Sequence, residues 1–267
     1  MATTKPVSEG VFQTVLENYI VSQARTVEAS VNRGLRALLE RNERLASEVF
    51  LTEPRINEME ILIDEHAIRM LRQGNLSDTD VRLIVATLKI NNDLERMGDL
   101  AVNLSERAVS LAGMGEIPIP AEIEPMTSAV RAMVSKCLGA LIYKNVDLAT
   151  QVLESDDVVD QFRDQVFEKL LAGITDNPAM AAPNLHYVLA SRHLERIADH
   201  ATNIHPPIVF NRRRDGRSDI RMVAADQHDR YRLRRRPAVQ VCLDLRHPPL
   251  SGVRQHAVRR ESQARRE

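Results

Sequence analysis

The sequence predicts an all-α protein, a tandem repeat of two three-helix bundles followed by an arginine-rich tail that fits neither bundle. Composition is the first reason, because aromatic residues make up 3% of the 267 residues and tryptophan is absent. Such a composition favours helices packed on helices over a sheet sandwich. The second reason is the helical spacing of apolar residues, and the third is an internal repeat.

The first repeat, residues 1–113, carries apolar side chains three and four positions apart. This spacing places them on one face of a helix. The clearest runs are Val27, Val31, Leu35, Leu38 and Leu39, and then Val81, Ile84, Val85 and Leu88. Ser77, with Asp80 three positions later, has the pattern of a helix N-cap. One helix is therefore predicted to end near Gln73 and the next to begin near Asp78.

A linker, residues 114–120, separates the first repeat from the second repeat, residues 121–205. The linker and the preceding Gly113 contain two glycines and two prolines, which interrupt helices. Further along, Asp176-Asn177-Pro178 and Pro183 predict a turn inside the second repeat.

The two repeats match position by position. With an offset of 100, LERMGDLAVNL (residues 94–104) falls on LERIADHATNI (residues 194–204), and 6 of the 11 positions are identical. The offset changes at the turn between the second and third helices, where a change of length is tolerated. With an offset of 103, Ala37, Leu38, Asn42, Leu45, Ala46, Val49 and Glu53 fall on Ala140, Leu141, Asn145, Leu148, Ala149, Val152 and Asp156.

The charge of the chain changes after His205. Residues 206–267 contain 16 arginines, no lysine and 7 acidic residues, whereas residues 1–205 contain 20 basic and 30 acidic residues. Pro206 and Pro207 are predicted to end the last helix. The tail beyond is predicted to be poorly ordered and removable from residue 212 onward. A coding sequence read in a shifted frame and an arm that binds nucleic acid are the alternatives.

Cysteine use and hydropathy predict a cytoplasmic protein. Cys137 and Cys242 stand far apart and form no CxxC pair, which fits a reducing compartment and argues against a disulfide or zinc-thiolate framework. The polar first ten residues predict no secretory signal. Apolar runs are interrupted by charges before they reach membrane-spanning length.

The strongest chemical signal is a pair of carboxylates four residues apart on a helix, which occurs in both repeats. Glu95 and Asp99, and again Glu195 and Asp199, share a helical face. Like charges at this spacing destabilise a helix by a few tenths of a kcal/mol. No nucleophile-and-base set, phosphate loop or dinucleotide-binding glycine pattern is present in the sequence, so no catalytic residue is predicted.

Antiparallel hairpins predict acidic partners on the second helix of each repeat. Residues at one level have numbers that add to a constant, so Glu53 is expected level with Asp99, and Asn57 level with Glu95. The same rule pairs Asp156 with Asp199, and Asp160 with Glu195. Glu60 and Asp64 extend the acidic line of the first repeat, whereas Arg163 and Phe167 stand at those positions in the second.

Two interpretations of these carboxylates remain open from spacing alone. Oxygen-rich clusters suit hard cations such as Mg²⁺, Mn²⁺, Ca²⁺ or iron. The carboxylates also lie opposite the apolar stripe of their helix, so they can form a solvated face in which Arg96 and Arg196 pair with Asp99 and Asp199. The second repeat is expected to bind metal more tightly, because Asn57 leaves the first cluster one carboxylate short.

LERMGD and LERIAD at an offset of 100, together with NEMEILIDE (residues 57–65), resemble the PhoU family over residues 10–205. The resemblance implies a cytoplasmic, non-enzymatic negative regulator of phosphate uptake and phosphate-starvation signalling. Such a protein is an adaptor between the ATPase subunit of the phosphate ABC transporter and a phosphate-sensing histidine kinase. A homodimer that reaches the membrane through its partners is also implied, and a last helix that continues for several turns.

The resemblance further implies metal clusters held by acidic pairs four residues apart. Glu95/Asp99, Glu195/Asp199 and Asp156/Asp160 match this pattern, and Glu53/Asn57 departs from it. A divalent or multinuclear metal is expected, with Mg, Mn, Fe and Zn as candidates. Two other functions were weighed: a carboxylate-bridged metalloenzyme, which lacks the required Glu-x-x-His, and a nucleic-acid-binding regulator that works through the basic tail.

Overall fold

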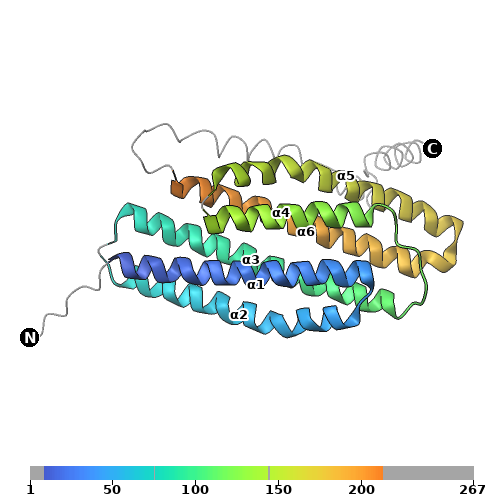
Figure 1. The fold of residues 1–267 in the computed structure, drawn as a ribbon, viewed down its shortest axis with the longest axis horizontal. Helices are drawn as coiled ribbons and strands as arrows, with labels where there is room; N and C mark the ends of the chain where they lie inside the picture. Colours follow the sequence, from blue (N-terminus) through green and yellow to red (C-terminus); the bar gives the residue numbers. More distant parts are fainter. Residues whose placement is uncertain (1–8, 75, 144, 213–267) are drawn as a thin grey trace, which may run out of the picture. The chain divides into compact units, whose positions relative to one another are not determined.

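The computed structural model describes residues 9–74, 76–143 and 145–212, and within them the chain forms six α-helices, one short 3-10 helix and no strand. The first repeat consists of α1 (Glu9–Glu40), α2 (Glu43–Arg72) and α3 (Asp78–Ala112). The second repeat consists of α4 (Ile123–Tyr143), α5 (Val146–Asp176), η1 (Pro178–Met180) and α6 (Ala181–Arg212) (Figure 1). The predicted tandem of two three-helix bundles is confirmed.

The helices pack as two equivalent bundles joined through their inner members. Helix α2 packs on α1 and α3, and α5 packs on α4 and α6. The bundles contact each other through α3 with α6 and through α1 with α4. Four helices therefore bury apolar side chains between the repeats, while α2 and α5 each cover one outer flank of this centre.

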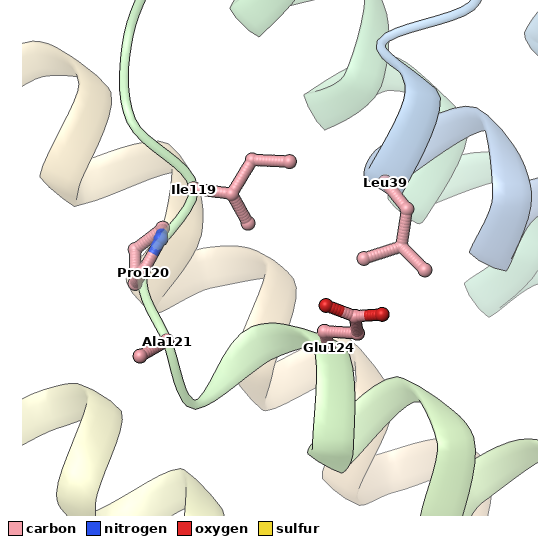
Figure 2. Close-up of a pocket in the computed structure, with 5 residues that line it drawn as sticks. All are labelled: Leu39, Ile119, Pro120, Ala121 and Glu124. Carbon is pink, nitrogen blue, oxygen red and sulfur yellow. The ribbon is translucent and has the colours of Figure 1, made fainter.

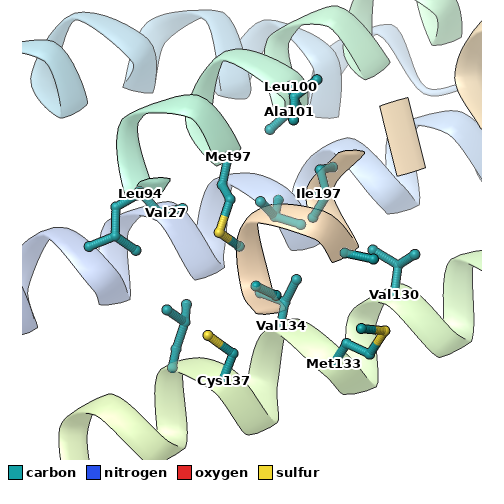
Figure 3. Packing of buried hydrophobic residues seen from close by; sticks show 14 of the residues in the cluster. Val27, Leu94, Met97, Leu100, Ala101, Val130, Met133, Val134, Cys137 and Ile197 are labelled. Carbon is teal, nitrogen blue, oxygen red and sulfur yellow. The ribbon is translucent and has the colours of Figure 1, made fainter. Parts of the chain in front are cut away.

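The apolar stripes of the two repeats meet in one continuous core. Leu94, Met97, Ala101 and Leu104 of α3 are fully buried, as are their counterparts Leu194, Ile197, Ala201 and Ile204 of α6. Figure 3 shows Met97 and Ile197 beside Val134 and Cys137 of α4. Burial of such side chains contributes roughly 1.5–3 kcal/mol each, so both copies of the stripe stabilise this core.

Repeated asparagines explain the matching turns between the first and second helices. The side chain of Asn42 accepts hydrogen bonds from the backbone N–H groups at the start of α2, and Asn145 does the same for α5. The backbone N–H of Asn42 also donates to the carbonyl of Ala37 at 3.0 Å, and that of Asn145 to Ala140 at 3.0 Å. Each asparagine closes one helix and starts the next.

The turn between α2 and α3 lies where the sequence places it. Helix α2 ends at Arg72 and α3 begins at Asp78. Ser77 and Asp80 form a reciprocal capping box, in which each side chain accepts from the other residue's backbone N–H. Gly74 has a φ of 67°, a conformation that glycine adopts without strain.

The predicted end of the last helix at Pro206 and Pro207 is wrong, because α6 continues through both prolines to Arg212. Proline removes one backbone hydrogen bond and crowds the preceding turn, which disfavours a helix without forbidding it, as Pro54 inside α2 also shows. The predictions for the arginine-rich tail beyond residue 212 lie outside the described residues. In the described part of the chain, no helix is long and apolar enough to cross a membrane.

Candidate functional site

The acidic residues of the first repeat meet along the groove between α2 and α3. Gly98 allows this close approach, because a Cβ placed there would lie 3.1 Å from Cδ1 of Ile56. Glu95 lies three positions before Gly98, and Asp99 follows it directly. The absence of a side chain at Gly98 therefore brings their carboxylates towards α2.

Glu95 lies at the centre of this first acidic cluster, which consists of Glu60, Asp64, Glu95 and Asp99. Its side chain is only 14% exposed, and burial together with the nearby charges of Asp99 and Glu60 raises its pKa to about 7. Arg96 opposes this effect and contacts Glu95 and Asp99, each at 3.4 Å. The pair between Arg96 and Asp99 is the one expected from their spacing.

Glu60 extends the cluster from α2. Burial raises the pKa of Glu60, with further contributions from the charges of Asp64 and Asp99. The charge of Asp99 thus contributes to the raised pKa of a carboxyl group on each helix, Glu60 on α2 and Glu95 on α3. Glu95 does not belong to a simple solvated face. Its side chain lies away from the apolar stripe of α3, but the neighbouring α2 covers it, so it is only 14% exposed.

Asn91 closes the far end of the cluster and was missed by the sequence analysis. It is 1% exposed, and its Nδ2 donates to Asp64 Oδ1 at 2.8 Å and to the Glu60 carbonyl at 3.0 Å. Its Oδ1 is buried and accepts no hydrogen bond. A polar residue at a buried position of the helix, between Leu88 and Leu94, is the signal that could have identified it.

The second acidic cluster consists of Asp156, Asp160, Glu195 and Asp199. Glu195 and Asp199 of α6 are the counterparts of Glu95 and Asp99, whereas Asp156 and Asp160 of α5 are the counterparts of Glu53 and Asn57. Asp156 is 1% exposed, which is unusual for a carboxylate. Arg163 of α5 reaches Glu195 with Nη1 at 3.5 Å and Asp164 with Nη2 at 2.9 Å. A guanidinium therefore contacts the second cluster from α5.

The structure brings together part of the predicted set. The charges of Asp64 and Asp99 act on Glu60, and those of Asp99 and Glu60 act on Glu95. Glu53 and Asn57 also lie on α2 and are partly buried. Within residues 9–212, no group of three or more His, Cys, Asp or Glu side chains is arranged to hold a metal ion. The donor chemistry nevertheless fits a hard cation, because carboxylates and the unpartnered Asn91 oxygen are the ligands such ions prefer.

A pocket of about 230 Å³ lies apart from both clusters. It is bounded by the C-terminal end of α1, the linker and the start of α4 (Figure 2). Its lining is Leu39, Ile119, Pro120, Ala121 and Glu124. With one carboxylate and a volume below the range of roughly 300–1,000 Å³ of small-molecule sites, it is not the candidate site.

A polar contact between α3 and α6 joins the two repeats. Asp93 Oδ1 of α3 lies 2.9 Å from His200 Nδ1 and 3.3 Å from Asn203 Nδ2, both on α6. The side chains of His200 and Asp93 are largely buried, whereas Asn203 is exposed. The contact aligns α3 against α6, which is a structural role for His200.

Comparison with known proteins matches the repeated architecture. The family model described as "PhoU domain" matches residues 20–108 and again residues 123–205. A "Phosphate-specific transport system accessory protein PhoU homolog" of Pseudomonas aeruginosa is 33% identical over 196 residues, which cover 73% of this chain and 81% of that protein. A homologue with the same description from Aquifex aeolicus is 32% identical over 177 residues, covering 66% and 80%.

Solved structures show the same arrangement of helices. The crystal structure of PhoU from Pseudomonas aeruginosa aligns with a TM-score of 0.74 at 31% identity, covering 76% of this chain and 98% of that chain. The phosphate transport system regulatory protein PhoU from Streptococcus pneumoniae aligns with a TM-score of 0.66 at 20% identity, covering 76% and 95%. The second likeness concerns the fold alone.

Proposed function

This chain belongs to the PhoU family, and on that premise we propose that it is a negative regulator of phosphate uptake and phosphate-starvation signalling. The observation that carries the proposal is the double match of the PhoU domain over both repeats. It is supported by relatives described as accessory proteins of the phosphate-specific transport system.

The regulator is proposed to act as an adaptor and not as an enzyme. Its partners are the ATPase subunit of the phosphate ABC transporter and a phosphate-sensing histidine kinase, which it contacts in the cytoplasm as a homodimer. The exposed helical surface supports this role, because α2 and α5 each leave one long face uncovered by the rest of the two repeats. Their solvent-facing apolar residues include Leu51, Ile61, Phe167 and Leu171.

Metal binding by the carboxylate clusters is the second part of the proposal. The residues that would hold a hard divalent or multinuclear cation are the acidic residues of α2 with α3, and of α5 with α6. A bound cation would neutralise the mutual repulsion of these carboxylates and tie the two helices of each hairpin together. The raised pKa of Glu95 reflects its burial first and then the negative charges of Asp99 and Glu60, which Arg96 only partly offsets; the charged neighbours support this part of the proposal.

A starvation reporter tests the regulatory proposal. In a host that lacks this chain and grows in high phosphate, the reporter is expected to be active, and the full chain is expected to silence it. Direct measurement of phosphate uptake in the same cells should show excess uptake without the chain. A reporter that stays silent in its absence, with normal uptake, contradicts the proposal.

A crosslinking experiment tests the adaptor role separately. The full chain is expected to crosslink to the transporter ATPase subunit and to the histidine kinase in membranes from phosphate-replete cells. Recovery of neither partner, from cells in which the chain silences the reporter, would contradict the adaptor role and leave regulation intact.

A further inference from the structure

We infer that the outer face of α2 binds the same face of a second copy of this chain, with the two α2 helices antiparallel. This inference rests on the homodimer in the proposed function and names the surface that forms it. Three features of the face carry it: exposed apolar side chains, charges sorted by sign along the helix, and the loss of both features at the equivalent face of α5.

The exposed face of α2 has the spacing of a helix-pairing seam. Helix α2 packs on α1 and α3 and lies at an edge of the fold (Figure 1). Residues that recur alternately every three and four positions share one stripe, which is the spacing at which two helices pair. Every member of this α2 stripe is exposed: Leu51, Pro54, Glu58, Ile61, Glu65, Ile68 and Arg72.

The apolar members of the α2 stripe are large and open to solvent. Leu51 is 80% exposed, Ile61 is 58% exposed and Ile68 is 46% exposed. Single exposed apolar residues are ordinary, but a continuous row of them marks an interaction surface. A second copy of the stripe would cover this row, because each copy presents apolar side chains at the same spacing.

The charges on this face are sorted by sign along the helix. Glu58 and Glu65 precede Arg69 and Arg72, and all four side chains are exposed. A parallel pair would place like charges opposite each other, whereas an antiparallel pair places the glutamates of one chain opposite the arginines of the other. The face therefore complements itself under twofold symmetry. Arg55, also exposed, lies beside the stripe and is the exception to this order.

The Arg69 side chain points back along α2 to the middle of the stripe. Its Nε donates to the Glu65 carbonyl at 3.3 Å, and its Nη2 lies 3.4 Å from His66 Nδ1. Side chains on a helix commonly point towards its N-terminus in this way. In the antiparallel pair, Glu65 of the partner subunit approaches this level, so the guanidinium can meet its carboxylate without a large rearrangement.

The equivalent face of α5 serves as an internal comparison. Positions 172 and 175, the counterparts of Arg69 and Arg72 at the offset of 103, carry alanine and threonine. Leu171 keeps the apolar character of Ile68. Three other members of the stripe become exposed acidic residues, since Leu51, Pro54 and Ile61 correspond to Glu154, Asp157 and Asp164. Acidic residues are typical of a face that water covers, so only α2 is suited to self-association.

The length of the stripe indicates a reversible dimer. From Leu51 to Arg72 the helix rises about 30 Å. One helix face of this length is modest beside a standard interface of roughly 800 Å² per partner. We expect the dimer to dissociate on dilution, and to weaken in high salt because its charges remain near solvent.

Sedimentation velocity of the purified full chain over a concentration series tests the inference. The wild type is expected to shift from monomer to dimer as its concentration rises. Ile68→Lys should raise the Kd of the dimer by at least about tenfold. Leu171→Lys makes the same change at the equivalent exposed position of α5 and should leave the Kd unchanged. Circular dichroism establishes that each variant is folded.

Charge-reversed chains test the pairing and its direction. Glu58→Arg with Glu65→Arg gives a basic stripe, and Arg69→Glu with Arg72→Glu gives an acidic one. Each double variant alone is expected to be monomeric, and an equimolar mixture is expected to restore the dimer. The chain with all four reversals should dimerise with itself but not with the wild type, because an antiparallel mixed pair would face like charges.

The outcomes separate the inference from the proposed function. A dimer retained by Ile68→Lys and by both double variants overturns the inference and leaves the homodimer standing, because the copies then meet elsewhere. A wild type that is monomeric at every concentration overturns both. If such a monomer loses its crosslink to the transporter ATPase subunit on Ile68→Lys, that partner covers the face instead. The reporter assay decides the regulatory proposal independently.

Discussion

Glu95 shows how one buried carboxylate couples the stability of the fold to pH. Its pKa is about 7 in the folded chain against an ordinary value of 4.5. Between these two pH values the folded state therefore holds a proton that the unfolded state has lost. Its contribution to stability is therefore present at low pH and disappears as pH rises from about 4.5 through about 7. Burial is the main cause, followed by Asp99.

Glu95→Gln is expected to remove this pH dependence. In a metal-free buffer at about pH 8, the variant should exceed the wild type in free energy of unfolding by roughly 1–3 kcal/mol. At about pH 5, where the folded wild type already carries the proton, the two should nearly coincide. Urea unfolding at both pH values is the measurement, with exposed Glu58→Gln as control; equal differences at both values would contradict the account.

Arg41 joins three parts of the chain from the end of α1. Its guanidinium donates to the carbonyl oxygens of Gly115 (3.2 Å) and Ile117 in the linker, and to the buried hydroxyl of Tyr187 on α6 at 3.0 Å. Its φ of 48° lies in the left-handed region, which costs a non-glycine residue about 1 kcal/mol. The hydrogen bonds to the linker and α6 offset this strain.

Replacing Arg41 separates its two effects. Arg41→Ala loses the hydrogen bonds and keeps the strain, so it should lower the free energy of unfolding by roughly 2–3 kcal/mol. Arg41→Gly loses the same bonds without the strain and should be less harmful by about 1 kcal/mol. Thermal and urea unfolding compare the two; an equal loss in both variants would show that backbone strain is unimportant here.

Sequence reasoning identified single residues best where local rules decide them. Ser77 and Asp80 act through neighbours a few positions away, so the N-cap they form was predicted from sequence. Asn42 and Asn145 were recognised only as matching repeat positions, and the structure shows that they cap α2 and α5. The burial of Glu95 depends on α2 covering α3. The hydrogen bonds that Asn91 makes depend on Glu60 and Asp64 of α2. Contacts between helices decide those properties, and helical spacing alone does not contain them.

At the scale of helices, the crossing of α2 with α3 is set by a complementary pair of residues. Gly98 faces Ile56 in the first repeat. The equivalent positions of the second repeat carry Ala198 and Val159, which are both buried. A methyl group has moved from one helix to the other while the total volume is conserved. Volume-conserving exchanges are the ones that packed cores tolerate.

A double-mutant cycle tests this complementarity. Gly98→Ala places its methyl 3.1 Å from Ile56 and should destabilise the fold by roughly 1 kcal/mol, after a gain in helix propensity is included. Ile56→Val should cost about 1 kcal/mol. The double variant should be more stable than the sum of the two effects by at least ~0.5 kcal/mol; strict additivity in urea unfolding would refute the pairing.

The helix ends divide into those that sequence could predict and one that it could not. Caps and glycine placed the turn at residues 73–77 correctly, because these signals act locally. Pro206 and Pro207 gave the wrong end for α6. Proline alters the local free energy of a helix, but the packing of preceding residues, such as Ala201 and Ile204 in the core, decides whether the helix continues.

At the scale of the molecule, the two repeats form one unit through the seam between α3 and α6. The buried stripes of both helices and the Asp93–His200 contact lie in this seam. Sequence predicted the duplication from its matching positions. Sequence could not predict the face on which the copies meet. The same apolar stripe packs within each three-helix bundle and against the other repeat, so its presence does not reveal the contact between repeats.

The tail is expected to be dispensable for this architecture. Truncation after Arg212, the last residue of α6, should leave the midpoint and the slope of urea unfolding unchanged, because the arginine-rich tail has no clear apolar period. Salt-dependent binding to DNA, compared between the full and truncated chains, tests the nucleic-acid alternative. An unfolded truncated chain would make the tail structural.

The central proposal that a measurement can decide is that the carboxylates between the second and third helices of each repeat bind a hard cation. Bound manganese in two matched double variants tests it most directly. Glu95→Gln with Asp99→Asn and Glu195→Gln with Asp199→Asn should each lower the manganese bound per chain, and the second variant should lower it more, because four carboxylates are available in the second repeat. A wild type that binds no manganese, or two variants that bind as much as the wild type, would contradict the account.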